Sequence, residues 1–323
     1  MAHELTIRKN KKAEMAYVGE TPWHGLGQAL DAGADLDQWR IAAGMDWKIS
    51  RSRVRYGEGD NQKIFDDKHV LFRSDTKDPL SIVSPGYKIV QPGEVLEFFK
   101  DLVGNNGFEL NTAGTLFGGK RFWGLAKVGE TATVAGRDEV GGYLLLSTSC
   151  DGSLATTARF TTVRVVCNNT LSMAVSKKQA TCVTINHRST FRAADVKADL
   201  GIARDAFKTF MDGARLLAST TIDIKLAEQF TAELLRDTGT VLKDDVRKSK
   251  QFNTVMNLYT GQGLGSKLEG TFGTLWGLTN AVTEFVDHRA RATSDSHRLA
   301  SAWFGRGDEL KTEAFAKALA IAA

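Results

Sequence analysis

The feature that most constrains this chain is the dipeptide Asp151-Gly152, which lies between two runs of β-forming residues. An Asp-Gly pair favours the tight turn of a β-hairpin, because glycine adopts a positive φ without steric cost. The second run, residues 154–167, is rich in Thr, Val and Phe and predicts a strand. It ends at Asn168-Asn169-Thr170, residue types that suit a helix N-cap, so we expect a helix to begin there.

A meander of antiparallel strands is predicted around this hairpin. Residues 140–150 precede the Asp151-Gly152 turn, and Gly118-Gly119 separates two further β-rich runs at residues 108–117 and 120–128. A helix is predicted over residues 92–103, because Pro92 suits its first turn and an apolar stripe follows. Residues 1–20 are polar and basic, and we expect them to begin as a flexible arm.

From Thr190 onward the apolar spacing becomes helical. The strands do not alternate with helices, so the predicted fold class is α+β: an antiparallel β-meander flanked by helices and followed by a helical C-terminal region. We expect an α+β domain over residues 1–190 and a mainly helical region over residues 191–323 packed on it. Helices are expected at residues 195–218, 222–235, 246–259, 275–291, 294–303 and 308–322.

The composition excludes several classes of protein. The chain has 323 residues, of which 42% are hydrophobic and 25% charged, as in soluble globular proteins. It has no apolar N-terminal segment of the signal-peptide type and no apolar run of about 18 residues, so we expect a cytoplasmic protein without a membrane span. Cys150, Cys167 and Cys182 form no CxxC pair, which argues against a disulfide scaffold and a zinc knuckle.

A row of arginines on a predicted strand is the main candidate for a binding site. Residues 47–56 have a β-like pattern, and the two-residue period of a strand places Arg51, Arg53 and Arg55 on one face. The net charge is only +4, so a nucleic-acid surface must come from such local clustering. Phosphates, a carboxylate-rich neighbouring subunit and water are all possible surroundings for the row. The complete set of cations on β-like runs is Arg51, Arg53, Arg55, Lys120, Arg121, Lys127, Arg159 and Arg164.

Five motifs together resemble the phage/plasmid-like protein family, a group described as a domain of unknown function. They are Trp23-His24-Gly25-Leu26-Gly27 and the segments 149–153, 164–171, 280–288 and 301–311. The resemblance implies a mobile-element context, in which single-stranded DNA, recombination and host defence are recurring problems. It brings no catalytic residues with it.

The order of a helix, a curved meander and a long helix also looks like that of single-strand annealing proteins, which form oligomeric rings. This analogy and the cations favour single-stranded nucleic-acid binding or strand annealing in DNA recombination or replication. The alternative is a protein-protein interaction factor that acts on host machinery or defence. Both would be cytoplasmic, and a homo-oligomer ring is possible for the first.

Hypotheses of an enzymatic function have less support. Cys167, His187 and Asn169 are the residue types of a thiol hydrolase, but Cys167 ends an apolar run typical of a buried structural thiol. Glu284 and His288 have the i,i+4 spacing of two metal ligands, yet a helix-surface ion pair explains that spacing more simply. We therefore predict no catalytic residue, no metal site and no cofactor.

Overall fold

The computed structural model describes residues 6–8, 12–19, 26–106, 108–164, 169–172, 182–192, 203–241 and 245–323. The α+β prediction is confirmed: antiparallel hairpins fill the N-terminal half, and the C-terminal region is helical. The chain forms two compact units. One comprises Met1–Gly129, Leu144–Arg159 and Cys182–Leu200, and the other Glu130–Tyr143, Phe160–Thr181 and Gly201–Ala323. The expected division into domains at residue 190 stays a prediction.

The larger sheet, as far as the described residues define it, has eight strands in the order β10-β9-β8-β7-β6-β1-β2, with β11 paired to β9. The pairs β9–β10, β9–β11, β6–β7 and β1–β6 are antiparallel, whereas β1 and β2 are parallel. The strands are β1 (Met15–Val18), β2 (Gln28–Leu30), β6 (Glu109–Leu116), β7 (Arg121–Thr133), β8 (Glu139–Ser149), β9 (Thr156–Arg164), β10 (Asn169–Ser172) and β11 (Cys182–Ile185).

Both predicted hairpin turns of this sheet are confirmed. Gly152 has a φ of 76°, and the Asp151 carboxylate accepts a hydrogen bond from the backbone N–H of Ser153 at 2.9 Å. Gly118 and Gly119, between β6 and β7, also have positive φ values of 70° and 92°. Glycine is needed at such positions because a Cβ atom would be strained there.

Two local predictions are wrong. Asn169–Ser172 is strand β10 instead of a helix start, because its residues pair with β9 from Thr161 to Arg164. An N-cap is worth only about 1 kcal/mol, so a neighbouring strand can outweigh it. Residues 15–18 are no flexible arm: they form β1, which pairs with β2 and β6, and Ala16 is fully buried.

Two helices belong to the first unit, α1 (Leu36–Ala42) and α2 (Pro92–Asn106). Phe98 and Phe99 of α2 are fully buried. A Cβ atom on Gly124 of β7 would lie 2.6 Å from the ring of Phe99. The ring therefore packs into space that only a glycine leaves free. The close approach fixes α2 against the β6–β7 hairpin, and the helix itself is the one predicted over residues 92–103.

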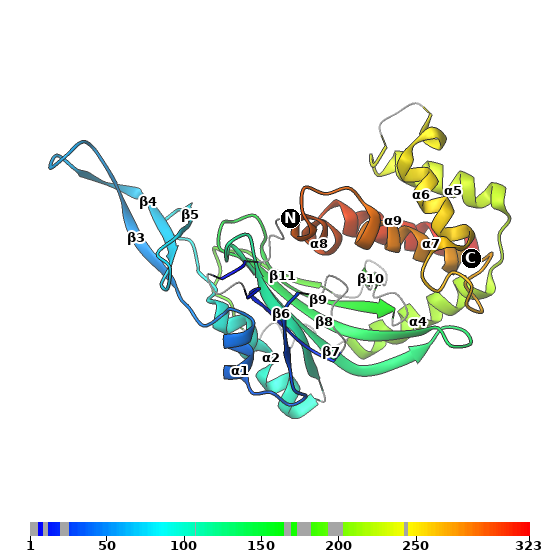
Figure 1. The fold of residues 1–323 in the computed structure, drawn as a ribbon, viewed down its shortest axis with the longest axis horizontal. Coiled ribbons are helices and arrows are strands. Elements are labelled where there is room, and N and C mark those ends of the chain that lie inside the picture. The colour runs from blue at the N-terminus through cyan, green and yellow to red at the C-terminus, as the bar shows by residue number, and fades with distance from the viewer. Residues whose placement is uncertain are drawn as a thin grey trace. The chain divides into compact units, whose positions relative to one another are not determined.

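A second, three-stranded sheet has the order β3-β4-β5. Its strands are β3 (Ile49–Tyr56), β4 (Lys63–Arg73) and β5 (Pro79–Val83). Figure 1 shows β3 and β4 continuing beyond β5 as a long hairpin. Ile49, Leu71 and Val83 are buried at the base of this sheet, whereas the side chains of residues 55–68 are exposed.

The second unit is mainly helical. Phe210 stacks on Phe315 with ring centroids 4.9 Å apart, and the indole N–H of Trp276 donates to the Asp138 carboxylate at 2.8 Å. None of the helices in the described ranges is long and apolar enough to cross a membrane. The helical segments are α4 (Ala203–Ser219), α5 (Ile224–Asp237), η1 (Val246–Lys248), α6 (Lys250–Asn257), η2 (Leu258–Gln262), α7 (Leu275–Glu284), η3 (Phe285–Arg289), α8 (Asp295–Phe304) and α9 (Arg306–Ala322).

Candidate nucleic-acid interface

The arginine row lies on β3, an edge strand of the three-stranded sheet. Arg51, Arg53 and Arg55 are exposed and alternate with Ser52 and Val54, so the three guanidinium groups leave the strand from one face. Within the described part of the chain, no carboxylate lies within ion-pairing distance of any of them. Neighbouring members of the row are about 7 Å apart along the strand, and their mutual repulsion is relieved only by water or by an external anion.

Arg51 differs from the other two members of the row. Its Nη2 donates to the backbone carbonyl of Tyr87 at 2.8 Å, and its Nη1 lies 3.4 Å from the carbonyl of Pro85. These carbonyls are neutral, so they orient the guanidinium but leave its positive charge uncompensated. The row therefore has an ordered first member at the base of the hairpin, followed by Arg53 and Arg55 farther out.

Aromatic side chains occupy the opposite face of the hairpin. Val54 pairs with Phe65, and the ring of Tyr56 packs edge-on against that of Phe65 with centroids 6.4 Å apart. Tyr56 is 55% exposed and Phe65 is 43% exposed. Solvent-exposed rings of this kind can stack on nucleic-acid bases or pack against a protein partner.

The hairpin is not uniformly basic. The register of β3 and β4 shifts between Arg53, which pairs with His69, and Val54, which pairs with Phe65. The exposed carboxylates Asp66 and Asp67 lie within this irregularity, and two more are near the turn, Glu58 and Asp60. The other exposed cations of the hairpin, Lys63 and Lys68, stand singly on β4, so the row is its largest group of positive charges and the favoured path for a phosphate chain.

A buried arginine anchors the hairpin at its base. Arg73 of β4 donates to Glu14 at 2.7 and 3.1 Å and to Asp75 at 2.8 and 3.0 Å, and its guanidinium lies 4.1 Å from the ring centroid of Trp47. Burial opposes the charge of Arg73, but the hydrogen bonds that Arg73 donates to Asp75 and Glu14 outweigh burial and raise the pKa of Arg73. Arg73 also approaches the carbonyl of Gly118 at 3.4 Å, which joins β4 to the β6–β7 turn.

The other predicted cations lie on the larger sheet, and no described contact joins them to the arginine row. Lys120 and Arg121 are half-buried at the β6–β7 turn, where Arg121 donates to the Ser153 hydroxyl at 3.1 Å. Burial lowers the pKa of Arg121, with the charge of Asp151 opposing that shift. The remaining three are Lys127, half-exposed on β7; Arg159, half-buried on β9; and Arg164, whose side chain lies outside the described residues.

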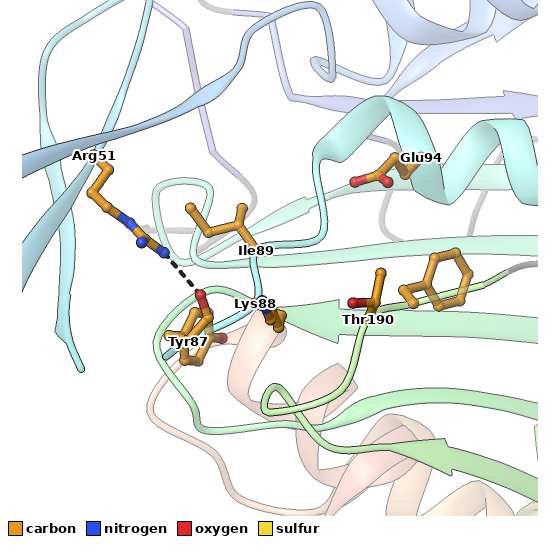
Figure 2. Close-up of a pocket in the computed structure, with 7 residues that line it drawn as sticks. Arg51, Tyr87, Lys88, Ile89, Glu94 and Thr190 are labelled. Atoms are coloured by element: carbon orange, nitrogen blue, oxygen red, sulfur yellow. Dashed lines mark hydrogen bonds between the residues drawn. The ribbon is translucent and has the colours of Figure 1, made fainter. Parts of the chain in front are cut away.

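A pocket of about 240 Å³ opens at the base of the hairpin. Figure 2 shows Arg51 reaching from β3 towards Tyr87, with Glu94 at the start of α2 and Thr190 on a segment far away in the sequence. Two contacts of His187 hold that segment in place. Its backbone carbonyl accepts from the Lys88 N–H at 2.6 Å, and its ring stacks on that of Tyr87 with centroids 4.7 Å apart. The complete lining is Arg51, Tyr87, Lys88, Ile89, Glu94, Thr190 and Phe191.

Among these lining residues, only Arg51 is a site residue predicted from the sequence. Residues 87–94 and 190–191 are about a hundred positions apart, and no local pattern indicates that they meet. The helix start at Pro92 was a visible signal, but it predicts only the local backbone. The pocket depends on the pairing between Lys88 and His187, which is a tertiary contact.

The residues considered for a thiol hydrolase or a metal site do not form a site in the described part of the chain. Cys167 and the Trp23-His24-Gly25 loop lie outside that part, and the side chain of Asn169 is also outside it. The ring nitrogens of His187 approach the carbonyls of Leu154 at 2.9 Å and Lys88 at 3.3 Å. No cluster of three or more His, Cys, Asp or Glu side chains that could hold a metal ion is found among the described residues.

Glu284, the other metal-ligand candidate, is buried, and its carboxylate accepts from the backbone N–H of Leu264 at 2.8 Å. Its second oxygen lies 3.5 Å from the guanidinium of Arg289. The Glu284 carboxylate therefore holds the loop before α7 through Leu264 and pairs with Arg289 of η3. The neighbouring carboxylate, Asp287, accepts from Lys311 at 2.8 Å, so the helix carries two acidic residues that pair with basic ones.

Comparison with known proteins places the chain in one family. The family model described as "Domain of unknown function (DUF932)" matches residues 79–303. The match covers more than half of the chain, which therefore belongs to this family. No curated protein and no solved structure matches it. The matched segment begins at Pro79, so the β3–β4 hairpin precedes it, whereas Tyr87, Glu94 and Phe191 lie inside it.

Proposed function

We propose that this member of the family binds single-stranded nucleic acid along the arginine row of the β3–β4 hairpin. The observation that carries the proposal is that Arg51, Arg53 and Arg55 share one exposed face and have no carboxylate partner in the described chain. Fixed cations on an exposed strand suit a phosphate backbone, because each neutralised phosphate releases condensed counterions.

Tyr56 and Phe65 lie on the other face of the hairpin from the arginine row, but β3 is an edge strand, so the bases of a flexible single strand can pass over this edge to the exposed rings. Bases of a single strand are free to stack on aromatic side chains, at about 1–3 kcal/mol per base, and this contribution tolerates any sequence. In a duplex the bases are already stacked and paired. The biological process that we propose for this binding is strand annealing during DNA recombination or replication of a mobile element, and the α2–meander–α4 order supports it by analogy with annealing proteins.

The test compares the parent with the double variant Arg53→Gln/Arg55→Gln. Arg51 is left unchanged because it orients the segment around Tyr87. Fluorescence anisotropy with a labelled single strand and a matched duplex, each at several salt concentrations, gives the affinity and its salt dependence. If each arginine contacts one phosphate, the slope of log K against log salt should flatten by about 1.4, at about 0.7 per contact.

Lys225→Gln/Lys250→Gln is a control with the same charge change, because both lysines are exposed on helices of the other unit. It should bind like the parent. A parent that never binds single strands, or an arginine variant with the parental slope, would show that the row is not a nucleic-acid site.

Protein binding by the hairpin is a second candidate, favoured by its exposed apolar side chains. Ile82 is 65% exposed and projects from the same face as Tyr56 and Phe65, since it pairs with Val70, the partner of Ser52. Exposed aromatic and aliphatic side chains that share one face are typical of the core of protein interfaces. Light scattering should then detect self-association or binding of a protein partner that Tyr56→Ser/Phe65→Ser abolishes, while Arg53→Gln/Arg55→Gln affects it less.

A further inference from the structure

We infer that the pocket beside Arg51 receives one nucleotide of the bound strand, with its base turned into the pocket and its phosphate at the Arg51 and Lys88 side. This inference rests on the proposed function, because it assigns a second contact to the same strand. Arg51 belongs both to the row and to the pocket lining, so a strand that follows Arg55 and Arg53 towards the base of the hairpin arrives at the pocket.

The cationic side of the pocket can hold a phosphate. Arg51 has five N–H donors, and the carbonyls of Tyr87 and Pro85 take one from each terminal nitrogen. The remaining donors are oriented but not neutralised. Lys88 is exposed, and no carboxylate pairs with its ammonium group in the described residues. Two such cations suit a phosphodiester better than a single surface lysine does.

The other side of the pocket is apolar and aromatic. Ile89 and Phe191 are both partly exposed, and the ring of Phe191 is supported by Phe98 of α2 with centroids 6.2 Å apart. A supported ring offers a face to a base without needing to be ordered on binding. At about 240 Å³, the pocket is smaller than the usual 300–1,000 Å³ of sites for whole small molecules, so it suits one base and not a dinucleotide.

Glu94 sets the orientation and a base preference. One of its carboxylate oxygens accepts from the backbone N–H of Gln91 at 2.6 Å, which keeps the side chain at the pocket. A carboxylate repels phosphate, so the phosphate must lie towards Arg51 and Lys88. The carboxylate can accept from the amino group of cytosine N4, whereas thymine has a carbonyl oxygen at that position. The pocket should therefore favour cytosine over thymine.

The direct test is photo-crosslinking of the full chain to a twelve-nucleotide deoxycytidine strand that contains 5-iododeoxycytidine, with the crosslinked residue identified by mass spectrometry. We expect a crosslink at Phe191 or Tyr87. Phe191→Leu should remove it and weaken binding about fivefold or more, because it removes a stacking face. Lys88→Gln should reduce the salt slope by about 0.7, and Lys225→Gln should leave it unchanged.

The parent should bind the deoxycytidine strand more tightly than a thymidine strand of equal length, and Glu94→Gln should reduce that difference. Glutamine keeps an oxygen for the Gln91 N–H, so the start of α2 is preserved. The pocket assignment is overturned if the parent binds both strands but crosslinks only on the β3–β4 hairpin, and if Phe191→Leu binds as tightly as the parent. The arginine row would remain as the binding site. If the parent binds neither strand, the proposed function itself fails and the pocket assignment fails with it.

Discussion

Replacing Asp287 by asparagine should destabilise the helical unit, because it removes the carboxylate that the buried ammonium group of Lys311 pairs with. Lys311 donates to Asp287 at 2.8 Å, and their side chains are only 1% and 7% exposed. Removal of one partner from such a buried pair costs about 3–5 kcal/mol, whereas replacing both by uncharged groups is often close to neutral. Asparagine has nearly the size of aspartate and retains an acceptor oxygen, so we expect a loss near the lower end, about 3 kcal/mol.

Urea unfolding at pH 7, followed by tryptophan fluorescence, measures this loss, since Trp276 of α7 is buried in the same unit. The variants form a cycle of Asp287→Asn, Lys311→Met and the two combined. The double variant should regain most of the stability that Asp287→Asn loses. Asp245→Asn is the matched control: its partner Lys248 is also 2.8 Å away, but both groups are exposed, so the unfolding midpoint should not move.

The reasoning is refuted if the stability losses of the two single variants add up in the double variant. It is also refuted if Asp287→Asn unfolds at the same urea concentration as the parent, because a buried charge that has lost its partner should be costly. Single-strand binding by the parent, if it occurs on the β3–β4 hairpin, should persist in Asp287→Asn. A variant that kept its stability but lost binding would place the nucleic-acid site on η3 instead.

Three further predictions concern the cysteines and glycines of the first unit. A thiol reagent should label the exposed Cys182 quickly and the buried Cys150 slowly in the native protein, and peptide mapping distinguishes the two. Burial, with a smaller effect from Asp151, raises the pKa of Cys150 to about 12, from 9.0. Its contribution to stability is fully present below pH 9 and falls as the pH rises from there towards 12, by about 1 kcal/mol at pH 10, and Cys150→Ala should remove that loss in urea unfolding. Gly119→Ala should lower the unfolding midpoint more than Gly118→Ala does, because a Cβ at Gly119 would lie 2.6 Å from the ring of Trp47 and one at Gly118 has open space.

Local signals predicted the hairpins of the larger sheet because their turns depend on a few adjacent residues. Gly152, Gly118 and Gly119 supply positive φ angles, so the turns and the β-forming runs beside them are enough to predict the strands. The arginine row was predictable for a similar reason, since alternation along one strand requires no knowledge of its neighbours. The strand Asn169–Ser172 was missed because its conformation is set by pairing with β9, and the helix-capping preference of Asn and Thr is weaker than that pairing.

The pocket shows why a site can stay hidden when most of its elements are predicted. The strand β3 and the helix α2 were each visible in the sequence, yet the segment that completes the pocket is held there by the hydrogen bond from the Lys88 N–H to the carbonyl of His187. The same region anchors the three-stranded sheet, because the Tyr87 hydroxyl donates to the Ser149 carbonyl at 3.0 Å, and the Ser81 hydroxyl to that of Cys150 at 2.6 Å. The backbone at the predicted β8–β9 turn thus fixes the base of the hairpin, and with it the direction in which the arginine row leaves the sheet.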